Sequence, residues 1–149
     1  MKVIIGVDGS PHSQATIAGV IAMAWPQRTE MVVVSAYQMP YAASTEAYAP
    51  VALDVSTTLA DLKQMHHAMA EHGAEQLKLA GFQARAIALE GDPSTVLLDE
   101  ARRVRADLLV VGSHGHTGIA SLLLGNVATH VVSHSPCNVL VVRRSAWAA

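Results

Sequence analysis

Cysteine is almost absent from this chain of 149 residues, which contains one, Cys137. A single thiol forms no internal disulfide, so the small secreted proteins held together by disulfides are excluded and a reducing compartment is expected. Because Cys137 opens an apolar, strand-like run, we interpret it as a buried, unreactive thiol and not as a nucleophile. The fold must therefore be stabilised by its core.

Aromatic residues are also scarce, at 4% of the chain, although 51% of the residues are hydrophobic. The core must then be built from aliphatic side chains. A composition this apolar is typical of a globular protein and excludes an intrinsically disordered one. The length predicts one domain over residues 1–149, which buries roughly two-thirds of its unfolded surface.

Charged residues make up 15% of the chain and leave a net charge of −2. The basic residues are scattered apart from short groups at 102–105 and 143–144, so no basic stripe indicates a nucleic-acid partner. No apolar run reaches the length that crosses a bilayer, and the run at 3–7 is too short for a signal peptide. These absences predict a cytoplasmic protein without a membrane or nucleic-acid partner.

Apolar, β-branched runs alternate with helical patterns along the chain. Continuous apolar runs are typical of strands buried on both faces of a parallel sheet. Ser10-Pro11 and Asp92-Pro93 each read as a helix N-cap followed by proline at the first helical position, and Gly81 fits the position just after a helix. The expected strands are 2–8, 30–38, 82–90, 106–113 and 138–144, the third nearer an edge; the expected helices are 10–25, 57–80, 94–104 and 126–134.

This order predicts an α/β fold with an open sheet of parallel strands and helices on both faces. Residues 39–58 have no clear period and are expected to form a long connection. In such sheets ligands bind beyond the carboxyl ends of the strands, where the strand order reverses. The first strand ends in Asp8-Gly9-Ser10 and the fourth in Gly112-Ser113-His114-Gly115, so we expect these two loops to face one crevice.

The fourth strand is followed by an unusual number of glycines: Gly112, Gly115, Gly118 and Gly125. Glycine lets backbone N–H groups approach an anion closely, and a helix N-terminus attracts phosphate. Asn126, a good N-cap residue, opens the helix that follows. The stretch 117–124 is expected to fold back as a helical turn that brings the glycines together. Two interpretations stay open: a phosphate cradle, or a loop in which the glycines serve only a turn and a helix cap.

Most familiar catalytic and metal-binding patterns are missing. The Walker pattern, a G-x-G-x-x-G after the first strand and a G-x-S-x-G are all absent, and the glycine-rich loop has no lysine or arginine for rapid phosphoryl transfer. We therefore predict no catalytic residue and no rapid phosphoryl transfer. No metal site is predicted from the histidines, because none of their pairs has a third ligand nearby. The pairs considered are His114 with His116, His67 with His72, and His130 with His134, which we interpret as a solvated face.

The spacing of Gly112, Gly115 and Gly125 matches G-x2-G-x9-G-[ST], the motif of the nucleotide-binding members of the universal stress protein family, which the chain resembles. "KVIIGVDGSPHSQAT" resembles the first strand and loop of that family. The resemblance covers essentially the whole chain, most weakly at 39–58. It implies a five-stranded parallel sheet in the order 3-2-1-4-5, a stress-response role, homodimerisation through the last strand, and binding of ATP, AMP or cyclic AMP, with Mg possible through Asp8 and water.

Carried over by position, the resemblance assigns roles to particular residues. Asp8 would meet the ribose or the adenine, although it also suits a turn residue that bonds its own backbone. The backbone near Val7 and Ala36 would line the adenine pocket. The other implied contacts are Gly112 at the ribose, His114, Gly115 and His116 nearer the phosphates, and Gly125, Asn126 and Val127 on the phosphates through backbone N–H groups.

Asn126 departs from the motif, which has serine or threonine there. An amide is bulkier than a hydroxyl, so the departure implies weaker or altered phosphate binding and favours a ligand with fewer phosphates. The alternatives to an adenine-nucleotide-binding regulator are a nucleotide-free dimeric interaction module and a slow ATPase.

Overall fold

A computed structural model describes residues 1–39, 55–115 and 124–144 of the chain. Residues 40–54 of the expected connection and 117–123 of the expected turn lie outside the described residues, as do His116 and Gly118, while residues 55–58 are already helical, so the helix begins about two residues earlier than expected. The predictions for these segments stay predictions.

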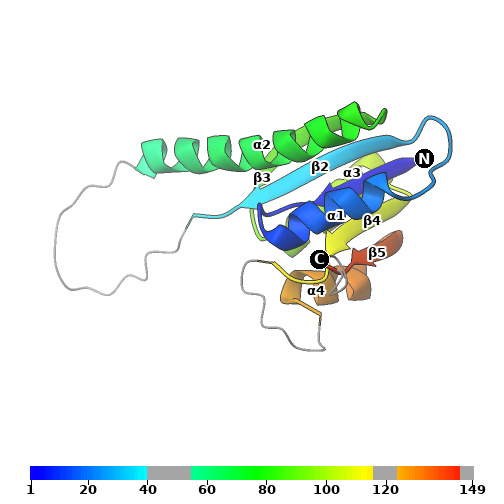
Figure 1. Ribbon diagram of the computed structural model, residues 1–149. Coiled ribbons are helices and arrows are strands. Elements are labelled where there is room, and N and C mark those ends of the chain that lie inside the picture. Colours follow the sequence, from blue (N-terminus) through cyan, green and yellow to red (C-terminus); the bar gives the residue numbers. More distant parts are fainter. Residues whose placement is uncertain (40–54, 116–123, 145–149) are drawn as a thin grey trace.

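Five parallel strands form one sheet in the order β3-β2-β1-β4-β5, as predicted (Figure 1). β1 lies at the centre, with Ile4 paired to Val32 on one side and to Leu109 on the other. The order reverses between β1 and β4, which places the switch point where the sequence placed it. The strands are β1 (Lys2–Gly6), β2 (Glu30–Tyr37), β3 (Gln83–Glu90), β4 (Leu108–Gly112) and β5 (Asn138–Val142).

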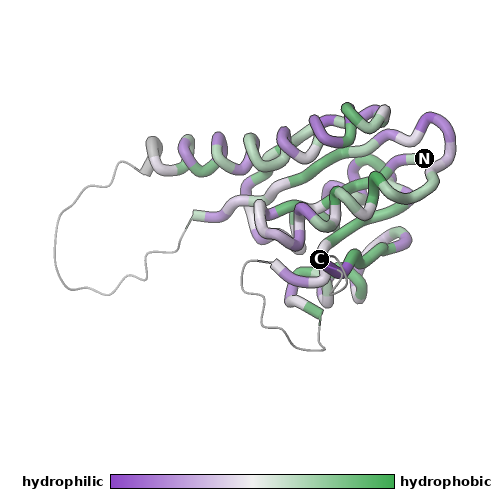
Figure 2. Tube along the Cα trace, in the orientation of Figure 1, coloured by the Kyte–Doolittle hydropathy of each residue, from purple (hydrophilic) through white to green (hydrophobic). Residues whose placement is uncertain are grey.

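Helices cover both faces of this sheet, which gives three layers. Residues of α1 (Pro11–Ile21) and α2 (Val55–Leu79) join one buried cluster with alternate residues of the strands, including Ile5 and Val33. Residues of α3 (Pro93–Val104) and α4 (Asn126–His134) join the other, which includes Ile4. Figure 2 shows the strands as the most apolar part of the trace. The core is aliphatic, as expected from the shortage of aromatic residues. Among the described helices none is long and apolar enough to cross a membrane.

The predicted helix starts are confirmed at two places. Ser10 accepts a hydrogen bond from the Ser13 N–H at the start of α1, and Asp92 accepts one from the Thr95 N–H at the start of α3. At the end of α2, Gly81 has a φ of +94°, a conformation that glycine adopts without strain.

Two expectations about local structure were wrong. The first helix ends at Ile21 and not near Trp25, because Pro26 disfavours helical backbone in the residue before it and the Trp25 indole donates to the Val20 carbonyl at 2.7 Å. Cys137 is partly exposed instead of buried, because it leads into β5, a strand at the edge of the sheet.

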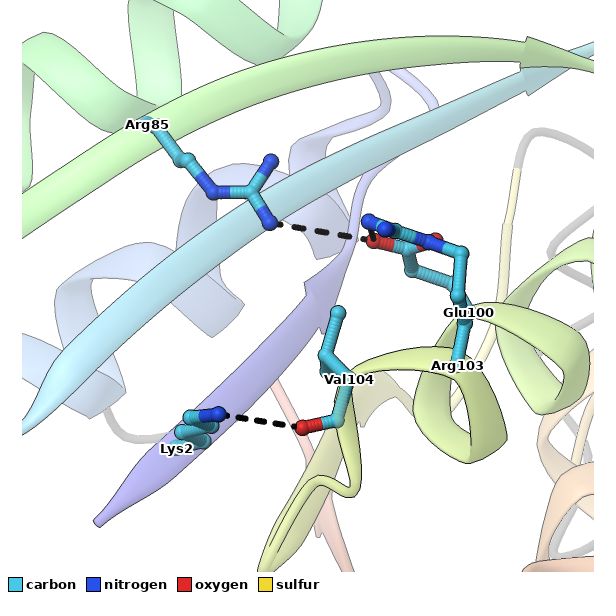
Figure 3. Close-up of polar contacts among 5 residues, drawn as sticks. All are labelled: Lys2, Arg85, Glu100, Arg103 and Val104. Atoms are coloured by element: carbon cyan, nitrogen blue, oxygen red, sulfur yellow. Dashed lines mark hydrogen bonds and ion pairs between the residues drawn. The ribbon is translucent and has the colours of Figure 1, made fainter.

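An ion-pair cluster ties α3 to the sheet at the amino ends of the strands (Figure 3). The Glu100 carboxylate, on a residue that is 4% exposed, accepts two hydrogen bonds of 2.6 Å from Arg103 and lies 3.8 Å from the guanidinium of Arg85 on β3. The hydrogen bonds that Arg103 donates to Glu100, together with the charge of that carboxylate, raise the pKa of Arg103. Nearby, the Lys2 ammonium donates to the Val104 carbonyl at 3.3 Å.

Candidate functional site

The loops after β1 and β4 meet at the switch point, as predicted. A Cβ atom on Gly115 would lie 2.6 Å from Oδ2 of Asp8, closer than such atoms approach in proteins. The two loops are therefore in direct contact, and any side chain at position 115 would push against the carboxylate.

Asp8 is fixed by its own loop, as the turn interpretation expected. Its Oδ1 accepts a hydrogen bond of 3.0 Å from the Ser10 N–H and another from the Ser13 hydroxyl, which in turn accepts one of 2.8 Å from the Asp8 N–H. Oδ1 thus serves the turn into α1, and Oδ2 faces Gly115.

Gly125 attaches the start of α4 to the same loop. Its N–H donates to the Ser113 carbonyl at 2.7 Å, and a Cβ at this position would lie 3.2 Å from that oxygen and from Cα of His114. The expectation for Gly125 has to be revised, because its N–H is engaged by the chain itself. The N–H groups of Asn126 and Val127 open α4, where an α-helix supplies no acceptor of its own.

The predicted N-cap of α4 was also wrong. Gly125 is the N-cap, with extended backbone at φ −63° and ψ 160°, and Asn126 is the first helical residue. No side chain caps this helix, in contrast to α1 and α3. Since both Gly and Asn suit an N-cap, sequence preference alone did not separate them.

Gly112 lies deeper than expected. A Cβ there would lie 3.1 Å from Oγ1 of Thr16 and 3.4 Å from the carbonyl oxygen of His12. Gly112 thus allows β4 to approach the first turns of α1, which explains this glycine without a ligand.

Val7 and Ala36 belong to opposite faces of the sheet. Val7 packs against the cluster under α1 and α2, its N–H donates to the Val34 carbonyl at 2.9 Å, and it lines a cavity of about 420 Å³ between these helices. Ala36 packs against the cluster under α3 and α4. Their side chains cannot line one pocket, which leaves only backbone groups for the shared role that the resemblance implied.

Two cavities lie elsewhere among the described residues. The cavity between α1 and α2 is largely apolar and includes Met65 and Met69 of α2. A second one, of about 300 Å³, lies at the opposite ends of the strands beside Lys2 and Arg85. Neither is lined by the three glycines of the motif.

The sequence analysis missed His12, the second residue of α1. Its ring lies 5.4 Å from the ring of His114, measured between centroids. The signal available in the sequence was its place just after the Ser10-Pro11 helix start, at the same sheet edge as the glycine-rich loop. In the part of the chain that the structure describes, no group of three or more His, Cys, Asp or Glu side chains is placed to hold a metal ion.

The protein is a parallel three-layer α/β domain in which glycine-containing loops meet at the switch point, the edge where open sheets of this class generally bind ligands. The family described as the universal stress protein family matches residues 1–143, and the chain belongs to this family. A universal stress protein from Thermus aquaticus is 30% identical over 142 residues, which are 95% of this chain and 97% of the relative.

Solved structures are similar over nearly the whole chain. A universal stress protein in complex with cAMP has a TM-score of 0.67 and 26% identity, covering 97% of this chain and 98% of that one. A universal stress protein family protein from Arabidopsis thaliana with AMP bound has a TM-score of 0.69 and 19% identity, covering 98% of this chain and 93% of that one. At 19% identity, the similarity to the Arabidopsis thaliana protein shows a shared fold and nothing further.

Proposed function

We propose that this protein binds an adenine nucleotide at the carboxyl ends of β1 and β4 and acts as a cytoplasmic regulator in a stress response, not as a fast enzyme. The observation that carries the proposal is the convergence of Asp8, Gly115 and the amino end of α4 in one place. The loop after β1 and the loop after β4, which are about a hundred residues apart in the sequence, meet there with the start of α4, and positions 115 and 125 carry no side chain.

The amino end of α4 supplies the anion-binding part. The N–H groups of Asn126 and Val127 have no acceptor within the helix, no side chain caps them, and the helix dipole adds positive potential. Asn126 is exposed and Val127 is half-buried, so both lie near the surface, where a ligand would arrive. Phosphate at this helix end would be bound by backbone groups.

Asp8 supplies a carboxylate for the nucleoside part. Its Oδ2 is directed at the loop that carries Gly115, within reach of a ribose hydroxyl in the same crevice. A Mg²⁺ ion carried by the phosphates would be held by Asp8 through water. In this proposal His114, His116 and the backbone at Val7 and Ala36 keep the roles that the family resemblance assigns to them, whereas Gly112 is accounted for by its packing against α1.

The charge of the glycine-rich loop indicates how many phosphates the nucleotide carries. The described residues of the glycine-rich loop include no lysine or arginine, and asparagine replaces the hydroxyl residue of the motif. We therefore expect AMP or cyclic AMP to bind at least as well as ATP. The cAMP complex of a 26% identical relative supports this choice.

We further propose a homodimer that pairs through β5. β5 is an edge strand with an unpaired side, and its residues from Val139 to Val142 are only half-buried in the single chain.

The test is a calorimetric titration of the full chain with AMP, cyclic AMP and ATP, repeated on Asn126→Pro and Asn126→Ala. Proline at the first helical position removes one N–H, and the extended backbone of Gly125 suits a residue before proline. If the N–H holds phosphate, Asn126→Pro lowers the affinity by about 10-fold or more, the value of one charge-assisted hydrogen bond. Asn126→Ala, which keeps the N–H, stays within about threefold of the parent.

Two results would count against the proposal. If none of the three nucleotides binds at millimolar concentration, the nucleotide-free interaction module becomes the better account. If both variants lose affinity equally, the side chain and not the amide is responsible. Slow ATP hydrolysis that survives Asn126→Pro would have to be assigned to another site.

A further inference from the structure

Two buried side-chain nitrogens among the described residues have no hydrogen-bond partner: Nδ1 of His12 and Nε2 of His114. Buried polar atoms in folded proteins are nearly always hydrogen-bonded, so each exception calls for a water molecule, an ion or a ligand. These two atoms belong to neighbouring rings, whose centroids are 5.4 Å apart and whose planes are inclined by 47°. One shared binding partner would satisfy both.

The two rings are held in place by different elements. His12 lies in the first turn of α1, against Gly112, where a Cβ would be 3.4 Å from the His12 carbonyl oxygen. His114 follows β4, and its Nδ1 lies 3.1 Å from the Ser113 hydroxyl. With Nδ1 hydrogen-bonded in this way, Nε2 is the nitrogen left over. Histidines that bind metals are commonly oriented by such a bond on the other ring nitrogen.

We propose that His12 and His114 together bind one divalent transition-metal ion, of the kind that prefers imidazole ligands, such as Zn²⁺ or Co²⁺. A metal about 2.1 Å from each nitrogen, at a tetrahedral angle, places two imidazole centroids roughly 5.2 Å apart. The observed 5.4 Å agrees with that separation. Water completes the coordination, since two protein ligands leave positions open.

A carboxylate lies against the loop that carries His114. Asp8 Oδ2 approaches Gly115, the residue after His114. If the proposed function is correct, a phosphate oxygen of the nucleotide would take one of the open positions, and this part of the inference alone rests on that function. Metal binding itself requires no nucleotide.

The experiment uses the full chain in a His130→Gln/His134→Gln background. This exposed pair on α4 has stacked rings 4.3 Å apart, and the four-residue spacing lets both reach one ion at the surface. Removing it leaves the internal pair to be measured. Co²⁺ alone is titrated and followed by its visible absorption, which is intense when the ion is tetrahedral, with Zn²⁺ as the competitor.

We expect one Co²⁺ per chain in this background. His12→Asn and His114→Gln place amides near Nδ1 and Nε2, which can hydrogen-bond water but bind the ion poorly. Each should weaken Co²⁺ binding by more than the roughly 10- to 100-fold that loss of an outer partner costs. The matched control is His72→Gln, an exposed histidine that lies 3.0 Å from the Gln76 amide, and it should change nothing. Circular dichroism and the melting temperature verify that each variant folds.

Other outcomes overturn the inference. If the background binds no Co²⁺ at 10-fold excess, or if the His12 and His114 variants bind it as tightly as the background, a water molecule is the better partner for the two nitrogens. If the variants do not fold, metal-induced stabilisation of the background decides instead: no rise in its melting temperature with Zn²⁺ refutes the site. Nucleotide titrations with and without Co²⁺ separate the two proposals, because a persistent Co²⁺ band without nucleotide binding leaves the metal site standing alone.

Discussion

Replacing Gly115 by alanine tests whether the contact between the two loops is as tight as the structure has it. The new Cβ would lie 2.6 Å from Oδ2 of Asp8, and an ordinary contact needs roughly 0.8 Å more. The carboxylate cannot move freely, because its Oδ1 accepts hydrogen bonds from the Ser10 N–H and the Ser13 hydroxyl. Relief of the clash therefore weakens at least one hydrogen bond to a charged group. We expect Gly115→Ala to lower the free energy of unfolding by about 1.5–3 kcal/mol.

A double-mutant cycle with Asp8→Ala isolates that contact. In the Asp8→Ala background the oxygen is gone, so Gly115→Ala should cost less than about 0.5 kcal/mol, which gives a coupling energy of about 1–2.5 kcal/mol. Urea unfolding of the four proteins, monitored by circular dichroism, measures it. An equal cost of Gly115→Ala in both backgrounds would refute the reasoning, because the glycine would then be needed for its backbone conformation and not for its distance from Asp8.

Three further predictions concern stability. Arg103→Met removes the two hydrogen bonds to the buried Glu100 carboxylate and should lower the stability in urea unfolding more than Arg102→Met, which breaks an exposed pair with Asp99 and should cost less than about 0.5 kcal/mol. Similar losses for the two variants would contradict this. Asp92→Ala removes the N-cap of α3 and should cost about 1 kcal/mol in the free energy of unfolding near neutral pH. Hydrogen bonds from Ser94 and Thr95 lower the pKa of Asp92 below 3.8, so its stabilising contribution is present above the pKa of the unfolded chain and is lost as the pH falls through the pKa of the folded protein. A mutational cost that does not shrink in acid would contradict this. Gly81→Ala should cost about 1 kcal/mol in the free energy of unfolding through its positive φ alone, since nothing lies within 4 Å of the added Cβ. Nucleotide affinity should be unaffected, and a loss of affinity would mean that destabilisation alone impairs binding.

Much of the fold was predictable because it follows from local rules. The apolar run 2–8 is typical of a strand buried on both faces, and it becomes the centre of the sheet. Ser10-Pro11 and Asp92-Pro93 mark helix starts through the capping oxygen and the fixed φ of proline, and both were confirmed. The early end of α1 was not predictable to the residue, because the Trp25 indole caps a carbonyl through its three-dimensional position.

The meeting of the loops after β1 and β4 was predictable, but their contacts were not. The sequence places Asp8 and Gly115 at the same edge of the sheet, and they touch. Which glycines the fold itself requires depends on packing that the sequence does not reveal: Gly112 accommodates Thr16, and the Gly125 N–H donates to the Ser113 carbonyl. His12 was missed because its role depends on a neighbour about a hundred residues away in the sequence, and periodicity carries no such information.

The most direct test of the nucleotide site is an amide NMR titration of the ¹⁵N-labelled full chain with AMP. The account predicts that the largest, saturable shifts fall on the N–H signals of Gly115, Asn126 and Val127, with Asp8 close behind. Shifts centred instead on the cavity between α1 and α2, around Met69 and Gly73, or no saturable shifts at millimolar AMP, would contradict it.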